Sequence, residues 1–282
     1  MQDSPEIRPG QSVELLKQLH ILTRDGKLNQ DSRRKLKQVY HLYHFIEPLM
    51  EKVYGNKQDL VLADHGAGKS YLGFILYDLF LKVREHGHVY SIETREELVE
   101  KSRNLSLRLA FPRMSFLSLP IADSIATSSL PAQVDIVTAL HACDTATDDA
   151  IRFALHKRAQ YIVLVPCCQA EVASVLNRNK NQSFGKTPLS EIWRHPIHTR
   201  EFGSTLTNVL RCLLLETHGY RLMVTELVGW EHSLKNELIV ATYTGNQRRS
   251  ARERLEMILA ELNLDELRFR FLYDVASTAR TD

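Results

Sequence analysis

The chain has 282 residues, 44% of them hydrophobic and 25% charged, which suits one large α/β domain with an added helical lobe. No stretch approaches the ~20 uncharged apolar residues that span a bilayer, and the N-terminus lacks a signal-peptide pattern. Four cysteines, two of them adjacent, do not resemble a secreted disulfide framework, so we expect a cytoplasmic protein. A net charge of +2 favours no class of partner.

The first 57 residues predict a helical lobe. Apolar residues recur at helical spacing over residues 12–24, with Ser12 as a cap, and again over residues 31–54, where Pro48 can bend the helix. The second helix opens with basic residues at 33–37, which form either a solvated face or an edge that faces phosphates. We assign residues 1–57 to this lobe and residues 58–246 to the main domain.

Residues 60–73 carry the strongest functional signal. An apolar strand ends at Asp64, a turn with Gly66, Ala67 and Gly68 follows, and a helix is predicted from Tyr71 onward. Glycines take left-handed dihedrals and let a ligand approach the backbone, and the start of a helix offers free N–H groups. The segment therefore predicts a cradle for a nucleotide.

Two ligand classes fit this cradle. Residues 63–70 nearly copy the phosphate-loop pattern of triphosphate-binding proteins, with Ala63 in place of the first glycine. The other class is S-adenosylmethionine, whose charged amino-acid end lies against such glycines. A carboxylate at the strand tip repels a triphosphate but receives an ammonium group directly or through water. Asp64 therefore favours the methyl donor.

A second acid follows the next predicted strand, residues 88–93. Glu93 lies about 25 residues beyond the glycines, close to the ~20 at which dinucleotide folds place the acid that binds ribose hydroxyls. We expect Glu93, with Thr94 beside it, to bind the sugar, although a capping role for Glu93 is the alternative. A helix over residues 95–110 and a strand near 114–119 follow, and Ile121 would then lie beside an adenine.

The fourth and fifth predicted strands, residues 134–140 and 161–165, end next to reactive side chains. These are His141, Cys143, Asp144 and Asp148 after the fourth strand, and Cys167 and Cys168 after the fifth. Because parallel strands end at one edge of the sheet, where ligands bind, we expect these side chains to converge near the donor's methyl group.

The C-terminal part predicts an insertion, a helix and two more strands. Residues 177–203 are polar and basic and predict a substrate-facing insertion, after which Ser204 or Thr205 can cap a helix to His218. Residues 220–228 and 237–244 predict an antiparallel pair whose connection faces the same cavity. From residue 247 to 282 the chain predicts a basic helix and tail.

The strand order and these strand ends resemble the class I S-adenosylmethionine-dependent methyltransferases. Three signatures, at residues 64–73, 141–148 and 166–168, are together similar to the methyltransferase-like branch that includes the glutathione-S-transferase-C-terminal-domain-containing protein. The last two are also similar to eukaryotic tRNA ribose 2′-O-methyltransferases that act in the acceptor stem. The resemblance covers about residues 35–245. It departs from the tRNA enzymes at Gln169 and Ala170, where they continue with histidines, and in having no zinc-binding accessory segment.

The resemblance implies an α/β, Rossmann-like sheet of seven strands, the last one antiparallel, with helices on both faces. The residues assigned to S-adenosylmethionine are Asp64, Gly66, Ala67, Gly68, Tyr71, Glu93, Thr94, Ile121 and His141. The residues assigned to the acceptor side are His141, Cys143, Asp144, Asp148, Cys167 and Cys168. No metal is assigned.

Methyl transfer from a sulfonium is an in-line displacement, and a base helps when the acceptor is a hydroxyl or a protonated nitrogen. His141 titrates near neutral pH, and Asp144 or Asp148 can orient it or accept the proton. Alternatively, Asp148 caps the following helix and His141 bonds the donor. There are two further alternatives. Cys167 could act as a nucleophile on a cytosine ring, or His141 and the three cysteines Cys143, Cys167 and Cys168 could bind zinc.

The leading interpretation is a methyltransferase that acts on RNA, either tRNA or rRNA. RNA follows from the resemblance, supported by basic residues at 33–37, 178–200 and 248–254. The rivals are a protein or small-molecule acceptor, an ATP-binding protein that uses the glycine loop, and a protein that binds the donor without catalysis.

Overall fold

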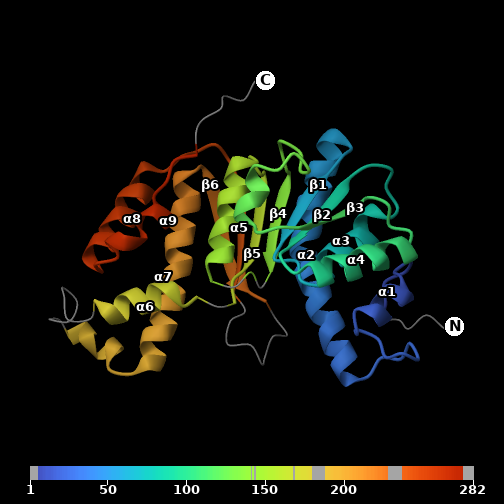
Figure 1. Cartoon of the computed structure of the whole chain (residues 1–282), viewed down its shortest axis with the longest axis horizontal. Coiled ribbons are helices and arrows are strands. Elements are labelled where there is room, and N and C mark those ends of the chain that lie inside the picture. The colour runs from blue at the N-terminus through green and yellow to red at the C-terminus, as the bar shows by residue number, and fades with distance from the viewer. Residues whose placement is uncertain are drawn as a thin grey trace.

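The protein is built around one seven-stranded sheet. The computed structural model describes residues 6–140, 142, 144–167, 169–179, 188–227 and 237–275. The strands are β1 (Val61–His65), β2 (His88–Glu93), β3 (Met114–Ser118), β4 (Ile136–Leu140), β5 (Tyr161–Val165), β6 (Tyr220–Glu226) and β7 (Glu237–Tyr243). Their order is β3-β2-β1-β4-β5-β7-β6 (Figure 1), and among these strands β7 alone runs in the direction opposite to all the others. The predicted fold class is confirmed.

Helices cover both faces of the sheet. The α-helices are α1 (Val13–Gln18), α2 (Gln30–Lys57), α3 (Tyr71–Leu76), α4 (Glu96–Arg108), α5 (Thr145–His156), α6 (Glu171–Arg178), α7 (Pro196–Thr217), α8 (Arg249–Glu261) and α9 (Arg268–Phe271). A π-helical turn, η1 (Tyr77–Leu81), continues α3, and short 3₁₀ turns are η2 (Ala122–Ile125), η4 (Pro188–Trp193) and η5 (Asp265–Leu267). Helices α1 to α4 lie at one end of the molecule in Figure 1, and α6 to α9 lie at the other.

Two apolar cores explain why the central strands are continuously hydrophobic. Side chains alternate along a strand, so Ile136 of β4 packs with α2, α3 and α4 on one face, and Val137 packs with α5 and α7 on the other. The N-terminal helices share the first of these cores, and the backbone N–H of Ser12 donates to Asp78 of η1 at 2.8 Å. The N-terminal helices are therefore packed and hydrogen-bonded against the main domain.

The helix ends differ in places from the predictions. Ser12 caps α1 as predicted, but the helix ends at Gln18. Helix α2 begins at Gln30, one residue before the predicted start, and Asn29 caps it by accepting a bond from the Ser32 N–H at 2.8 Å. The prediction that Ser204 or Thr205 caps a helix is wrong, because α7 begins at Pro196. Proline suits a first helical turn, where its missing N–H has no intrahelical partner anyway.

Candidate functional site

The turn between β1 and α3 has the backbone that the sequence predicts. Gly66 and Gly68 have φ values of +62° and +57°, and Ser70 at the start of α3 has +54°. A Cβ at Gly66 would lie 3.3 Å from the Cβ of Ala142, closer than most such contacts. Glycine is therefore required at Gly66 by both dihedral and space, and the backbone of the turn is open to a ligand.

Asp64 is the next-to-last residue of β1, which ends at His65 rather than at Asp64 as predicted, and it is 2% exposed. Its Oδ1 accepts a hydrogen bond of 2.7 Å from the Thr138 hydroxyl, and the backbone N–H of Gly73 also donates to the carboxyl group. Burial raises the pKa of Asp64 to about 7, although both hydrogen bonds act in the opposite direction. The group is thus poised to ionise when a cation comes close.

Glu93 ends β2 on the other side of the turn. Its Oε2 accepts from the Gly68 N–H at 2.7 Å, and its Oε1 accepts from Arg95 Nε at 3.0 Å. Burial would raise the pKa of Glu93, but the hydrogen bonds from Arg95 and Gly68 outweigh it and hold the pKa below its usual value. Glu93 is therefore a carboxylate at neutral pH, tied to the glycine turn.

Two cavities meet at Gly66 and Arg95. The first, of about 450 Å³, lies between the turn and the N-terminal helices, and the second, of about 400 Å³, lies between β2 and the start of α5. The predicted residues that line the first are Asp64, Gly66, Ala67, Gly68 and Tyr71, and those that line the second are Gly66, Glu93, Thr94 and Ile121. The structure brings together every predicted donor residue that it describes.

Several lining residues were missed by the sequence analysis. Helix α2 contributes Lys35, Gln38, Val39 and Leu42 to the walls of the first cavity, and Arg95, which precedes α4, contributes to both cavities. Val39 and Leu42 stand three residues apart, the spacing of an apolar helix face, which was the available signal. The sequence did not show that this face would close over the glycine turn.

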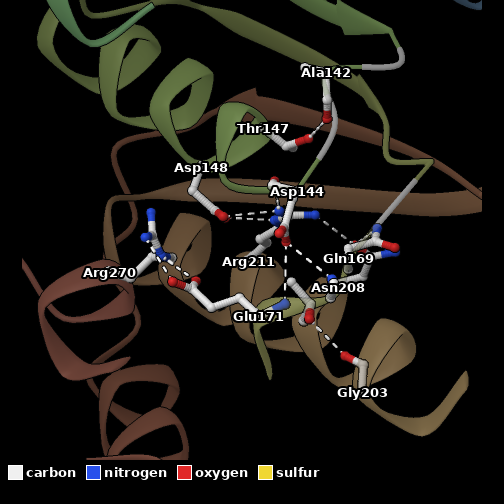
Figure 2. A network of polar contacts seen from close by, with 12 residues as sticks. Ala142, Asp144, Thr147, Asp148, Gln169, Glu171, Gly203, Asn208, Arg211 and Arg270 are labelled. Carbon is white, nitrogen blue, oxygen red and sulfur yellow. Dashed lines mark hydrogen bonds and ion pairs between the residues drawn. The ribbon is translucent and has the colours of Figure 1, made fainter. Parts of the chain in front are cut away.

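On the acceptor side, two predicted acids are held by the protein itself (Figure 2). Asp144 Oδ1 accepts from the backbone N–H groups of Ala170 at 3.1 Å and Glu171 at 3.4 Å. Asp148 receives Arg211 on both oxygens, from Nε at 2.6 Å and from Nη2 at 3.0 Å. Asp148 is thus engaged in a buried ion pair, and its role in proton transfer stays a prediction.

Of the remaining residues predicted on the acceptor side, the structure describes only Cys167. His141, Cys143 and Cys168 lie outside the described residues, as do the connection at 228–236 and residues 180–187 of the predicted insertion. Cys167 is half-buried after β5. Among the described residues no group of three His, Cys, Asp or Glu side chains could hold a metal ion.

A third cavity, of about 610 Å³, lies beyond β5. Its walls come from Pro166, Gln169, Glu201, Ser204, Thr205, Asn208, Val224, Thr225, Glu226 and Glu237. Three of these residues are glutamates, and the described lining includes no basic side chain. The third cavity therefore has acidic side chains in its wall, of which Glu201 pairs with Arg200, whereas the first cavity is lined by Lys35 and Arg95, which pair with Asp31 and Glu93.

The basic clusters predicted to meet phosphates are largely paired with carboxylates. The ion pairs are Arg33–Glu6, Lys35–Asp31, Arg178–Glu266, Arg194–Glu191, Arg200–Glu201, Arg248–Glu216, Arg249–Glu253, Arg252–Glu256 and Arg254–Glu216. Paired charges contribute little net field at a distance, although exposed pairs are weak enough to exchange for another anion. These clusters therefore support RNA less than their sequence suggested.

Three features define a class I methyltransferase architecture. They are a seven-stranded sheet with one antiparallel strand, a glycine turn after an acid near the end of the first strand, and a second acid at the end of the next strand. The sequence agrees with this class, because residues 34–175 match the model of a methyltransferase-domain family. The chain belongs to this family. The predicted enzyme class, with S-adenosylmethionine as its cofactor, is confirmed.

Solved structures with a similar fold are methyltransferases. Magnesium protoporphyrin IX methyltransferase from Synechocystis PCC 6803, solved with bound SAH, is 12% identical, with a TM-score of 0.44 over 82% of this chain and 93% of that one. Precorrin-6y C5,15-methyltransferase from Geobacter metallireducens is 17% identical, with a TM-score of 0.39 over 66% and 80%. An rRNA methylase from Streptococcus thermophilus is 10% identical, with a TM-score of 0.42 over 66% and 87%.

A search of curated protein sequences gave no significant match. Within the described part of the chain, no helix combines the length and apolar character needed to cross a bilayer.

Proposed function

We propose that the protein transfers a methyl group from S-adenosylmethionine to RNA, with the donor lying across the two cavities that meet at Gly66. The observation that carries this proposal is the placement of two acids on either side of one glycine turn. Asp64 lines the first cavity and Glu93 lines the second. A ligand with a cationic end and a ribose needs an acid at each of two such positions.

The second cavity fits the adenosyl half of the donor. Glu93 is ionised and would accept hydrogen bonds from both ribose hydroxyls. The Gly68 N–H already fixes one of its oxygens, so the carboxylate is oriented before any ligand binds. Ile121 lines the same cavity and offers an apolar surface for a purine ring.

The first cavity fits the amino-acid half. Asp64 would receive the ammonium group, and Tyr71 and Leu72 at the start of α3 line the walls beside it. A triphosphate fits less well, because a nearly buried carboxyl group at the strand tip would have to stay neutral beside it. When bound, S-adenosylmethionine supplies a methyl group activated for in-line displacement.

For the acceptor side we propose that His141 accepts a proton from the attacking group and that Asp144 helps to fix the turn that carries it. Asp144 supports this assignment because it follows β4, the strand next to β1, and is anchored to the start of α6. His141→Ala should leave donor binding intact and slow turnover. Unchanged turnover in that variant would remove His141 from the mechanism.

RNA is supported by the narrower resemblance and by charge at the first cavity. Lys35 and Arg95 line its walls, where they pair with Asp31 and Glu93, and Lys69 is exposed in the turn that precedes α3. Lys69 adds a positive charge at this cavity, and the exposed ion pair of Lys35 is weak enough to exchange for a phosphate, which favours an acceptor that carries phosphates. The similarity of residues 141–148 and 166–168 to tRNA ribose methyltransferases points in the same direction.

A basic acceptor, such as an amine on a protein or a small molecule, is the second candidate. The observation that favours it is the third cavity, where Glu201, Glu226 and Glu237 line the sheet edge beyond β5. Carboxylates at this place would attract a cationic group and repel a phosphate. The two candidates therefore predict opposite substrates at the same edge.

Two measurements test these proposals. Isothermal calorimetry with S-adenosylhomocysteine (SAH) and with ATP separates the ligand classes, and binding of ATP without SAH would overturn the methyltransferase function. Tritiated donor incubated with total RNA, protein and small-molecule fractions from cells that lack the protein identifies the acceptor. We expect label in RNA. Label confined to the protein or small-molecule fraction would refute the RNA assignment and support the second candidate.

A further inference from the structure

Asp144 has a backbone conformation that a residue with a Cβ rarely adopts. Its φ is 51° and its ψ is −119°, outside the left-handed helical region as well as the extended and right-handed regions. Such strain persists only where surrounding contacts over-determine the chain, and it concentrates at functional sites. The strained residue precedes α5, four residues after the end of β4, on the acceptor side of the proposed donor site.

Arg211 of α7 supplies the contacts that hold this turn. Its Nη2 donates to the backbone carbonyl of Asp144 at 2.8 Å, and its Nε and Nη2 bind both oxygens of Asp148 one turn further along. Arg211 has no exposed surface, so these bonds form away from bulk water, where they are strong. One guanidinium therefore fixes both the strained carbonyl and the first turn of α5 (Figure 2).

The same guanidinium is connected to the third cavity. Its Nη1 donates to Asn208 Oδ1 at 3.2 Å, and the same oxygen accepts from Gln169 Nε2 at 3.1 Å. Asn208 in turn donates to Glu237 Oε2 at 2.8 Å. Gln169, Asn208 and Glu237 all line that cavity. A continuous polar network thus runs from the cavity wall to the turn after β4.

We propose that Arg211 is a positioning residue for methyl transfer, which holds the strained turn at Asp144 in its productive geometry and connects that turn to the third cavity. The inference rests on the proposed function, since it assigns the turn after β4 to the acceptor side. It assigns no catalytic contact to Arg211. Asp148 becomes the partner that orients the guanidinium rather than a base.

The main test compares Arg211→Lys with the wild-type protein. Lysine keeps the charge but loses the planar fork that reaches Asp144, Asp148 and Asn208 together. We expect kcat on the labelled fraction to fall at least about tenfold, as for other small misplacements of a reacting group, while the SAH dissociation constant stays within about twofold. Thr207→Val is the matched control, because its buried hydroxyl bonds only the Gly203 carbonyl of its own helix.

Asp148→Asn provides the second variant in case the lysine substitution does not fold. If Asp148 only orients Arg211, the substitution lowers kcat by the same factor at every pH from about 6 to 9. The variant that combines Arg211→Lys with Asp148→Asn should then have a kcat no lower than that of the poorer single variant. If Asp148 is a base, the asparagine variant loses the acidic limb of the pH profile, which would overturn the proposal.

Amide hydrogen exchange tests the role of Arg211 without requiring that the acceptor be known. The Ala170 and Glu171 amides bond to Asp144, so a displaced turn should make them exchange faster in Arg211→Lys but not in Thr207→Val. Should no fraction accept label, the acceptor proposal fails while the exchange measurement still stands. Wild-type exchange at these amides, or unchanged kcat, in a folded Arg211→Lys variant would refute the role of Arg211.

Discussion

Replacing Asp64 with asparagine separates charge from shape at the proposed ammonium site. The pKa of the buried carboxyl group is raised to about 7, so only about a tenth of it is ionised at pH 6. If the donor's ammonium requires the carboxylate, SAH should bind about tenfold more weakly at pH 6 than at pH 8. Asp64→Asn should lose this dependence and bind at least about tenfold more weakly than wild type at pH 8.

The same substitution should stabilise the protein without ligand. Because the folded-state pKa of Asp64 lies above its usual value of 3.8, the stability that the neutral carboxyl group contributes is complete below pH 3.8 and is lost as the pH rises through about 7. The interval between these values corresponds to about 4 kcal/mol. Asparagine stays neutral and can still accept from Thr138, so the melting temperature of the variant should exceed the wild-type value by an amount that grows from pH 5 to about 7 and is constant above about pH 8.

Calorimetry with SAH at several pH values and thermal unfolding of the ligand-free protein check both expectations. Asp135→Asn is a suitable control, since Asp135 is also buried but binds Lys57 and the Val61 N–H at the opposite end of β1. The control should leave the pH dependence of SAH binding unchanged. Equal SAH affinity of wild type and Asp64→Asn at pH 8 would refute the ammonium contact.

Further substitutions test the ribose contact and the glycine turn. Glu93→Gln removes a charged acceptor of the ribose hydroxyls, so calorimetry should show SAH binding about 10- to 100-fold more weakly. An SAH affinity within about twofold of wild type would refute the ribose contact. Gly66→Ala and Gly68→Ala both place a Cβ at a positive φ, which should cost about 1–2 kcal/mol of unfolding free energy in denaturant titrations. Only Gly66→Ala also meets a neighbouring Cβ at 3.3 Å, so it should be the more damaging, and equal effects would contradict the crowding argument.

The central strands could be predicted from the sequence because their signals are local. The strands at 88–93 and 161–165 have the predicted bounds, since an apolar run with β-branched residues bounded by turn residues fixes both ends of a buried strand. Asp64 and Glu93 were found for a related reason. Each is the last or nearly the last residue of such a strand, and the rule that parallel strands end at one edge brings them together.

Contacts between distant segments could not be predicted in this way. Arg211 and Asp148 are 63 residues apart, and nothing in the pattern around either residue identifies the other as its partner. The sequence assigned Arg211 no role, and it treated Asp148 as a base or a cap. The start of α7 was misplaced for a different reason, because serine is a strong capping residue and Ser204 competes with a proline whose helical position depends on its neighbours.

The two acids beside the glycine turn, Asp64 and Glu93, have pKa values shifted in opposite directions. Comparing the pH dependence of SAH binding with that of adenosine binding tests this difference. Glu93 is held ionised by Arg95, so binding a neutral ribose there needs no proton transfer. Asp64 has no cationic partner among the causes of its shift, so binding an ammonium there releases a proton near neutral pH. Adenosine carries the ribose but not the ammonium.

The affinity for adenosine should therefore be the same at pH 6 and pH 8, whereas the affinity for SAH should rise over that interval. Both affinities are measured by calorimetry on the same protein preparation. A pH dependence shared equally by the two ligands would mean that a group other than Asp64 titrates, and the assignment of the two cavities to the two halves of the donor would then fail.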